Sequence, residues 1–437
     1  MSKAAQPSWA ARVVGGWLGR TSVFWFATYA VVFAFTTYFC MYSFRKPFAA
    51  ADYEGATYWI FDLKNALVIS QLIGYAISKF VGIRFNSELL HRHRLAALVV
   101  LILWAEGALL LFAVLPPGGK VLAIFLNGLP LGAVWGIVFS FLEGRQSSEL
   151  LGAGLSCSYI VASGFVKSAG KGLMEAGVAE SWMPAATGAM FLPVFLLAAY
   201  ALSLLPAPTA QDVKLRSLRQ PMRAKERKAF ARRYWPGLVL LIATYLFLTS
   251  YRDFRDNYAA EIWKEVGMGD SAVIFTKTEL PIAAVVMVIL GLLYLIRDNR
   301  RGLAAAYGIM IAGSVLVGLS TLLFDLGVVG PTWWMTLVGL GLYMGYVPYG
   351  CVLFDRKIAA LQTVATAVFL IYISDAVAYG GSVVAVLYKQ LGEPQTSWLQ
   401  FFRGFSYLTS AVCTLALLGS AVYFMRETKP AGRSPET

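Results

Sequence analysis

The sequence has 437 residues, of which 58% are hydrophobic and only 14% are charged, and its mean hydropathy is +0.64. An average soluble domain has about 25% charged residues, and its core could not hold so many apolar side chains. A bilayer can hold them, because each helix that crosses it needs about 20 mostly apolar residues. The composition therefore excludes a soluble or disordered protein and predicts an integral membrane protein.

The chain is strongly basic, with 37 Lys and Arg against 24 Asp and Glu and a formal net charge of +13. In a membrane protein this excess is typical of cytoplasmic loops next to anionic lipid, so the lipid bilayer is an expected partner and nucleic acid is not. The four cysteines lie inside apolar runs without a paired short spacing, which indicates neither a disulfide framework nor a zinc site. We expect no metal and no cofactor.

Twelve apolar runs are each long enough to cross a bilayer as a helix. They cover residues 22–45, 63–83, 95–115, 121–142, 150–172, 183–205, 235–256, 271–296, 303–325, 332–354, 359–388 and 397–425. The first run is too long for the apolar part of a signal peptide and no small-residue cleavage site follows it, so we expect the N-terminus to be retained. The sequence thus predicts an all-α polytopic membrane protein with twelve transmembrane helices.

Charge is distributed unequally between the two sides of these predicted spans. Lys3, Arg12 and Arg20 precede the first span, and the even-numbered connections and the C-terminal tail are rich in Lys and Arg. The other side has more acids, among them Asp52, Glu54, Asp62, Glu175, Glu180 and Asp270. By the positive-inside rule both termini are expected in the cytoplasm, in a protein of the cell (inner) membrane.

The longest polar stretch, residues 206–234, contains nine Lys and Arg and divides the spans six and six. The fourth and tenth spans, at matching places in the two halves, carry glycines at a spacing of four: Gly128, Gly132 and Gly136, and Gly341 and Gly345. Such spacing lets helices approach closely, and its recurrence indicates an internal six-helix repeat, the major facilitator architecture. The predicted divisions are a cytoplasmic N-terminus (1–21), a first half (22–205), a basic linker (206–234), a second half (235–425) and a cytoplasmic tail (426–437).

Charged side chains occur within or at the edges of the predicted spans: Arg45, Lys79, Glu106, Lys167, Arg252, Lys277, Glu279 and Asp375. Each costs about 2.5–3.5 kcal/mol near the bilayer centre, so each is a candidate functional residue. Several share a helix face with phenols, as Tyr38 and Tyr42 do with Arg45. Because guanidinium groups bind phosphate or carboxylate oxygens bidentately, Arg45 and Arg252, facing each other across the repeat, predict a clamp for a compact anion.

Other roles remain open for some of these charges. Lys46 and Lys167 lie near outer helix ends, where lysines usually extend to the lipid headgroups. Lys277 and Glu279 are two residues apart and so do not share a helix face; their roles stay open. Glu106 and Asp375 lie in the middle of their spans. Three roles stay open for them: a structural hydrogen bond, transfer of a coupling proton, or an ion pair with a buried cation.

Short patches resemble a known family, the organophosphate:phosphate antiporters of the major facilitator superfamily. Residues 38–49 resemble the signature of its first helix, and residues 75–80, Tyr-Ala-Ile-Ser-Lys-Phe, are similar to its second. Residues 245–252 and 258–266 look like its Arg-bearing seventh helix and the segment that follows, and Glu279 falls where the family carries a Glu.

The resemblance implies that Arg45 and Arg252 grip a phosphoryl group and that Lys79 assists them. It also implies that three tyrosines complete the pocket: Tyr38, Tyr42 and Tyr75. Tyr159 stands where the family has a substrate-contacting His, so a hydrogen-bond donor is retained. Glu279, Asp375 and Glu106 remain as coupling or ion-pair residues.

The function that these observations favour is secondary active transport of a small organic anion by alternating access. The resemblance implies a phosphorylated metabolite exchanged for inorganic phosphate, by a protein that we expect to be a monomer. Two alternatives stay open: a proton-coupled transporter of a carboxylate or another solute, and a non-transporting sensor of such a ligand. An enzyme is not expected, because no nucleophile-elbow, phosphate-loop or His-Glu-x-x-His pattern is present and the only histidines, His91 and His93, lie in a loop.

Overall fold

The computed structural model describes residues 9–143, 145, 148–207, 224–269, 271–361 and 367–428. Of the predicted linker, residues 208–223 lie outside this part of the chain, as do Asp270 and most of the predicted C-terminal tail. Almost all described residues are helical. The sheet they contain is a two-stranded hairpin of β1 (Thr57–Tyr58) and β2 (Phe61–Asp62).

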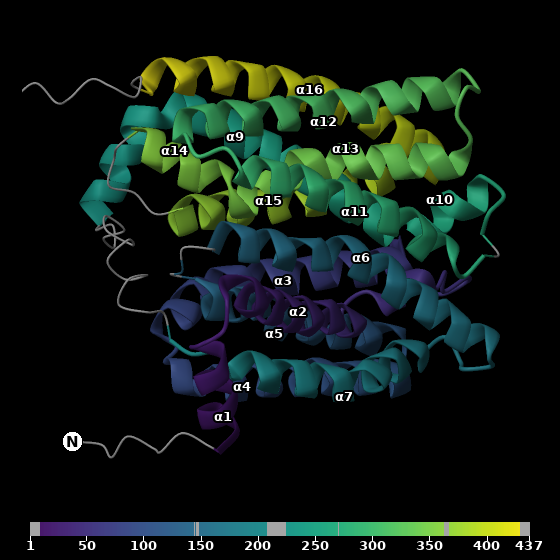
Figure 1. Cartoon of the computed structure of the whole chain (residues 1–437). Coiled ribbons are helices and arrows are strands. Elements are labelled where there is room, and N and C mark those ends of the chain that lie inside the picture. Colours follow the sequence, from purple (N-terminus) through teal and green to yellow (C-terminus); the bar gives the residue numbers. More distant parts are fainter. Residues whose placement is uncertain are drawn as a thin grey trace, which may run out of the picture.

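The long helices form two groups that lie against each other (Figure 1). The first group, drawn in purple and blue, contains α1 (Trp9–Leu18), α2 (Val23–Met41), α3 (Leu63–Glu88), α4 (Arg94–Val114), α5 (Pro117–Leu142), α6 (Ser148–Glu175) and α7 (Met183–Ser203). The second contains α9 (Ala224–Asn257), α10 (Ala259–Glu265), α11 (Ile274–Tyr294), α12 (Asn299–Asp325), α13 (Pro331–Cys351), α14 (Leu353–Leu361), α15 (Ala367–Leu387) and α16 (Trp398–Glu427). Short helices η1 (Tyr42–Phe44), η2 (Pro47–Ala50), η3 (His91–His93) and η4 (Tyr388–Gly392) complete the described chain.

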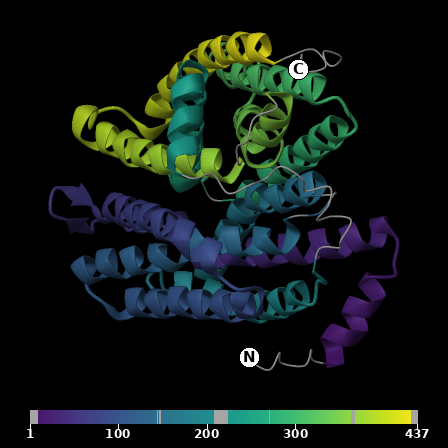
Figure 2. The same cartoon turned by 90° about the vertical axis from the view of Figure 1, so that its left-hand side faces the viewer.

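The groups meet along α3 and α6 of the first group and α11, α13 and α15 of the second. In the contact region α6 packs against α11 and α3 packs against α15. The view along the bundle in Figure 2 shows the same separation into two groups. The described ends of the chain, at α1 and at the end of α16, lie at one end of the bundle, and α10 lies at the opposite end (Figure 1).

Twelve long helices occupy the twelve predicted ranges. Within the described residues, nine are long and apolar enough to cross a membrane, and a tenth is counted if α13 and α14, bent by 51°, form one span. The helices α3 and α15 are not among these ten. Polar residues within α3 include Lys64, Asn65, Gln71 and Lys79. The all-α polytopic prediction is confirmed.

Several boundaries differ from the predicted ones. The helix α9 begins at Ala224, well before the predicted residue 235, so the end of the predicted linker is helical. Of the predicted run 359–388, residues 359–361 belong to α14 and residues 367–387 form α15, whereas residues 362–366 lie outside the described part of the chain. The sequence also did not predict α1, the β hairpin or α10.

The first span ends earlier than predicted. The helix α2 ends at Met41 and continues as the 3₁₀ turn η1, and η2 then begins at Pro47. Pro47 cannot donate the backbone hydrogen bond that would continue the helix, which explains the break between η1 and η2. The freed carbonyls of Phe44 and Arg45 accept hydrogen bonds at 2.9 Å from the side-chain amides of Asn127 and Gln71 respectively.

The predicted glycines do allow close helix packing, but against different partners in the two groups. A Cβ atom at Gly128 of α5 would lie 2.7 Å from the carbonyl oxygen of Gln71 in α3. A Cβ atom at Gly341 of α13 would lie 2.5 Å from the carbonyl oxygen of Gly313 in α12. The glycine spacing therefore occurs in both halves, but the fourth span packs against the second span and the tenth span packs against the ninth.

We expect Gly128→Ala to lower the free energy of unfolding by about 1–3 kcal/mol, because the added methyl group would push α5 away from the backbone of α3. Thermal unfolding of the purified protein in detergent measures this effect. The control is Gly172→Ala, since a Cβ there meets no atom within 4 Å. Equal melting temperatures for the two variants would contradict the close approach.

Candidate functional site

One cavity lies between the two helix groups and is lined by fourteen residues. They are Tyr38, Tyr42, Arg45, Tyr75, Lys79, Trp135, Ser156, Tyr159, Tyr245, Arg252, Tyr346, Gly350, Asp375 and Tyr379. The cavity has a volume of about 50 Å³, which is enough for a few water-sized groups. Arg45 and Arg252 thus line the same cavity from α2's end and from α9, as the sequence led us to expect.

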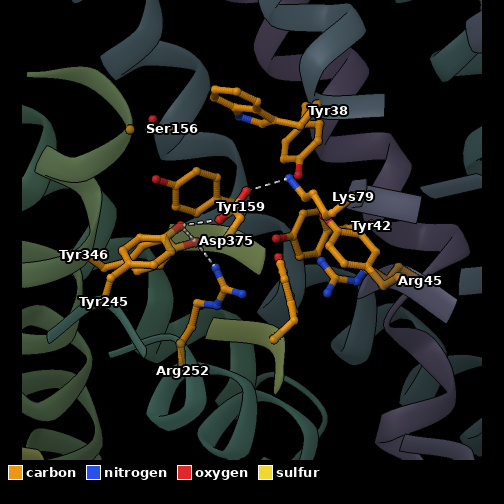
Figure 3. A pocket seen from close by; sticks show the side chains of 14 residues that line it. Tyr38, Tyr42, Arg45, Lys79, Ser156, Tyr159, Tyr245, Arg252, Tyr346 and Asp375 are labelled. Atoms are coloured by element: carbon orange, nitrogen blue, oxygen red, sulfur yellow. Dashed lines mark hydrogen bonds and ion pairs between the residues drawn. The ribbon is translucent and has the colours of Figure 1, made fainter. Parts of the chain in front are cut away.

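The two arginines have different surroundings (Figure 3). Arg252 donates to the Asp253 carboxylate, with its Nη2 2.8 Å from Oδ1, and its Nη1 donates to the hydroxyl of Tyr346. Arg45 is 3% exposed and has its guanidinium carbon 3.9 Å from the ring centroid of Tyr75. Among the described residues none forms an ion pair with Arg45, and its Nε has no hydrogen-bond partner.

Asp375 connects the two groups at the cavity. Its Oδ2 lies 3.2 Å from the ammonium nitrogen of Lys79 in α3, and its Oδ1 accepts a hydrogen bond of 2.7 Å from the hydroxyl of Tyr245. The Tyr245 hydroxyl also lies 3.1 Å from that of Tyr346. Figure 3 shows this chain of polar contacts running across the cavity from Lys79 to Arg252.

Towards α10, ion pairs join the first group to the second and cover the cavity. Asp256 of α9 lies 2.5 Å from the Lys46 ammonium and 2.7 Å from the Lys167 ammonium, and it also accepts a hydrogen bond from Ser163. Lys64 lies 2.5 Å from Glu261 of α10. We call these contacts the α10-end ion pairs.

The α10-end ion pairs continue to the protein surface. Lys264 of α10 lies 2.7 Å from Glu54, and the pair lowers the pKa of the Glu54 carboxyl group and raises the pKa of Lys264. Burial raises the pKa of Glu261, although the Lys64 ammonium opposes that shift. The exposed members of this network are therefore ionised near neutral pH, as a charge-paired closure requires.

Some predicted charges lie elsewhere. Glu279 does not line the cavity; it lies 2.7 Å from Arg255 of α9, which also donates to the carbonyl of Met335. Glu106 is buried in α4 beside Gly188 of α7, where its Oε2 has no hydrogen-bond partner in the described structure. Lys277 is exposed on α11.

The expectation that Lys46 and Lys167 extend to the headgroups is wrong. Lys46 is 2% exposed and Lys167 is 3% exposed, because both turn inward to Asp256. Their partner on α9 had not been singled out in the sequence, although Asp253 and Asp256 are three residues apart and so share a helix face. The same rule connects Asp375 with Tyr379, another cavity residue that the sequence reading missed.

Comparison with known proteins identifies a family and a fold. A family model described as a family of unknown function, DUF5690, matches residues 47–427. The chain belongs to this family. No curated protein matches it by sequence.

Two solved structures share the fold of this DUF5690 protein. The crystal structure of a D-xylose–proton symporter has a TM-score of 0.60 and 15% identity, over 94% of this chain and 98% of that one. The crystal structure of a mutant of the peptide transporter POT in complex with sulfate has a TM-score of 0.57 and 15% identity, over 92% and 96% of the two chains. The predicted major facilitator fold is confirmed, whereas the relationship to the organophosphate antiporters stays a prediction.

We expect Asp256→Asn to reduce the free energy of unfolding by about 3–5 kcal/mol, because it leaves two buried ammonium groups without a carboxylate. Thermal unfolding in detergent gives the measurement. The matched control, Glu54→Gln, removes an acid from the exposed part of the same end and is expected to leave the melting temperature unchanged. An equal loss of melting temperature in the two variants would show that burial does not determine how much each of the α10-end ion pairs stabilises the protein.

Proposed function

We propose that this DUF5690 protein is a secondary active transporter that carries a phosphorylated small organic anion across the membrane in exchange for inorganic phosphate. The observation that carries the proposal is the cavity to which each helix group contributes one arginine, Arg45 and Arg252. Two guanidinium groups, an ammonium group and several phenols can donate the hydrogen bonds that phosphoryl oxygens accept. We propose that Tyr38, Tyr42, Tyr75 and Tyr159 donate to its remaining oxygens.

Alternating access requires closures on both sides of the ligand that open in turn, and the described contacts supply a candidate for each. The α10-end ion pairs join the groups on one side of Arg45. The Lys79–Asp375 pair joins them further along α3, towards the end where the described chain termini lie. The two structural neighbours are a D-xylose–proton symporter and a peptide transporter, which supports transport as the general function.

The orientation in the membrane is part of the proposal. Basic residues lie at helix ends on the side opposite α10. Arg92 and Arg94 lie in η3 and at the start of α4, Arg145 donates to the carbonyl of Pro206 after α7, Arg300 donates to the carbonyl of Met425 near the end of α16, and Arg356 lies in α14. We propose that this end, with both termini, faces the cytoplasm, which the positive-inside rule favours. We also propose that the protein is a monomer in the inner membrane of the cell.

We expect Arg252→Lys to weaken binding of inorganic phosphate by at least about tenfold, because an ammonium group keeps the charge but cannot form two parallel hydrogen bonds. Isothermal titration of the purified protein measures the affinity. Lys277→Gln, a change of an exposed charge on α11, is the control and is expected to bind as the parent does. Equal affinity for all three proteins would show that Arg252 does not hold the anion.

Transport itself is tested by phosphate counterflow in proteoliposomes. We expect labelled phosphate to enter vesicles loaded with unlabelled phosphate, and Arg45→Lys to abolish that entry. Phosphate binding without any counterflow would identify a sensor in place of a transporter.

A second candidate function, proton-coupled uptake, rests on Glu106, a buried carboxylate whose Oε2 lacks a hydrogen-bond partner among the described residues. Exchange of two anions needs no such proton, so we expect Glu106→Gln to retain counterflow and the parent to show no accumulation driven by a pH gradient alone. Accumulation in the parent that disappears in Glu106→Gln would replace antiport with proton coupling.

A further inference from the structure

The cavity contains more positive charge than its own acids neutralise. Of its three cations, Arg252 is paired with Asp253 and Lys79 is paired with Asp375. Arg45 is buried and has no acidic partner in the described part of the chain. The empty cavity therefore carries one uncompensated positive charge, and a buried net charge is costly in a low-dielectric environment.

A phosphomonoester dianion without any other charge would overcompensate this cavity. If Arg45 and Lys79 both turned to the phosphoryl group, Asp375 would lose its ammonium partner and keep only the hydrogen bond from Tyr245. A carboxylate in that position would be a buried and unpaired charge. Its cost opposes binding of a plain dianion.

A ligand that also carries an ammonium group removes this cost. Its phosphoryl group would pair with Arg45 and Lys79 and accept a hydrogen bond from Arg252, which keeps Asp253 as its ionic partner. Its ammonium group would take the place of Lys79 at Asp375. Every charge in the cavity is then paired, because the ligand brings one net negative charge. The monoanion of inorganic phosphate satisfies the same balance.

The walls of the cavity also suit an ammonium group. Seven of the fourteen lining residues are tyrosines, and rings with their faces towards a site attract cations. The cations already present show this preference, since Arg45 lies over the ring of Tyr75 and Arg252 lies 4.6 Å from the ring centroid of Tyr346.

Building on the proposed anion transport, we propose that the substrate class is an aminoalkyl phosphate, with its phosphoryl group at Arg45 and its ammonium group at Asp375. Arg45, after the end of α2, and Asp375, on α15 of the second group, both line this cavity (Figure 3). A short ligand with opposite charges at its two ends can therefore contact both residues. Asp375 is then the residue that selects for the ammonium group.

The test compares two probes that differ in one group, phosphoethanolamine and 2-hydroxyethyl phosphate. Isothermal titration of the parent protein in detergent is expected to show phosphoethanolamine binding at least about tenfold more tightly, because a charged hydrogen-bonded pair is lost in the hydroxyl analogue. This comparison needs no variant. Equal or tighter binding of 2-hydroxyethyl phosphate would overturn the inference while leaving anion transport in place.

The variant Asp375→Asn then assigns the selectivity to a residue. It is expected to bind 2-hydroxyethyl phosphate more tightly than the parent does and to bring the two affinities within about twofold of each other. Glu393→Gln, which neutralises an acid after η4 outside the cavity, should preserve the parent's preference. An unchanged preference in Asp375→Asn would remove Asp375 from the recognition of the ammonium group.

A third result would contradict the proposed function as well. If neither probe nor inorganic phosphate bound in a manner that Arg45→Lys weakens, the proposed anion function would fail together with this inference. The two failures are distinguishable. Failure of this inference alone changes the preference between the two probes, whereas failure of the anion function removes binding of both probes and of inorganic phosphate.

Discussion

The cost of an ion in a low-dielectric environment governs this structure. Buried cations occur along α3, α6 and α9 and beside the end of α2, and most of them lie within hydrogen-bonding distance of a carboxylate. Removing one partner of such a pair strongly destabilises the folded protein, because the other charge stays buried without a partner. A conformational change that separates the helix groups must therefore give each ion a new partner or bring it to water. Among the described residues, Arg45 and Lys357 are both buried without a carboxylate partner; of these two, Arg45 lines the cavity, which makes it the place where a ligand's charge is needed.

Sequence periodicity predicted the parts of the fold that depend on apolar length. The twelve long helices follow directly from runs of apolar residues, and the confirmed major facilitator fold follows from their number and division. Boundaries at special backbone positions were less predictable. The early end of α2 involves Pro47 and the side-chain amides of α3 and α5. The contacts with these amides join distant segments, so the local sequence does not predict them.

The candidate site was predicted in part, for a physical reason. Residue type and helix face placed Tyr38, Tyr42 and Arg45 together, and all three line the cavity. Pairing between distant segments has no such local signal. The interactions of Lys46 and Lys167 with Asp256 depend on how the two groups of helices meet, so end-of-span position alone gave the wrong surroundings for both lysines.

The break after α2 has a consequence for the order in which the chain assembles in the membrane. The carbonyl of Phe44 receives its hydrogen bond from Asn127 on α5, and the carbonyl of Arg45 receives its hydrogen bond from Gln71 on α3. Hydrocarbon offers no substitute donor, and a chain is delivered to the bilayer from its N-terminus. The end of the first span therefore cannot reach its final state until the fourth span has been inserted, so the earliest segment to be synthesised is completed by one that arrives much later.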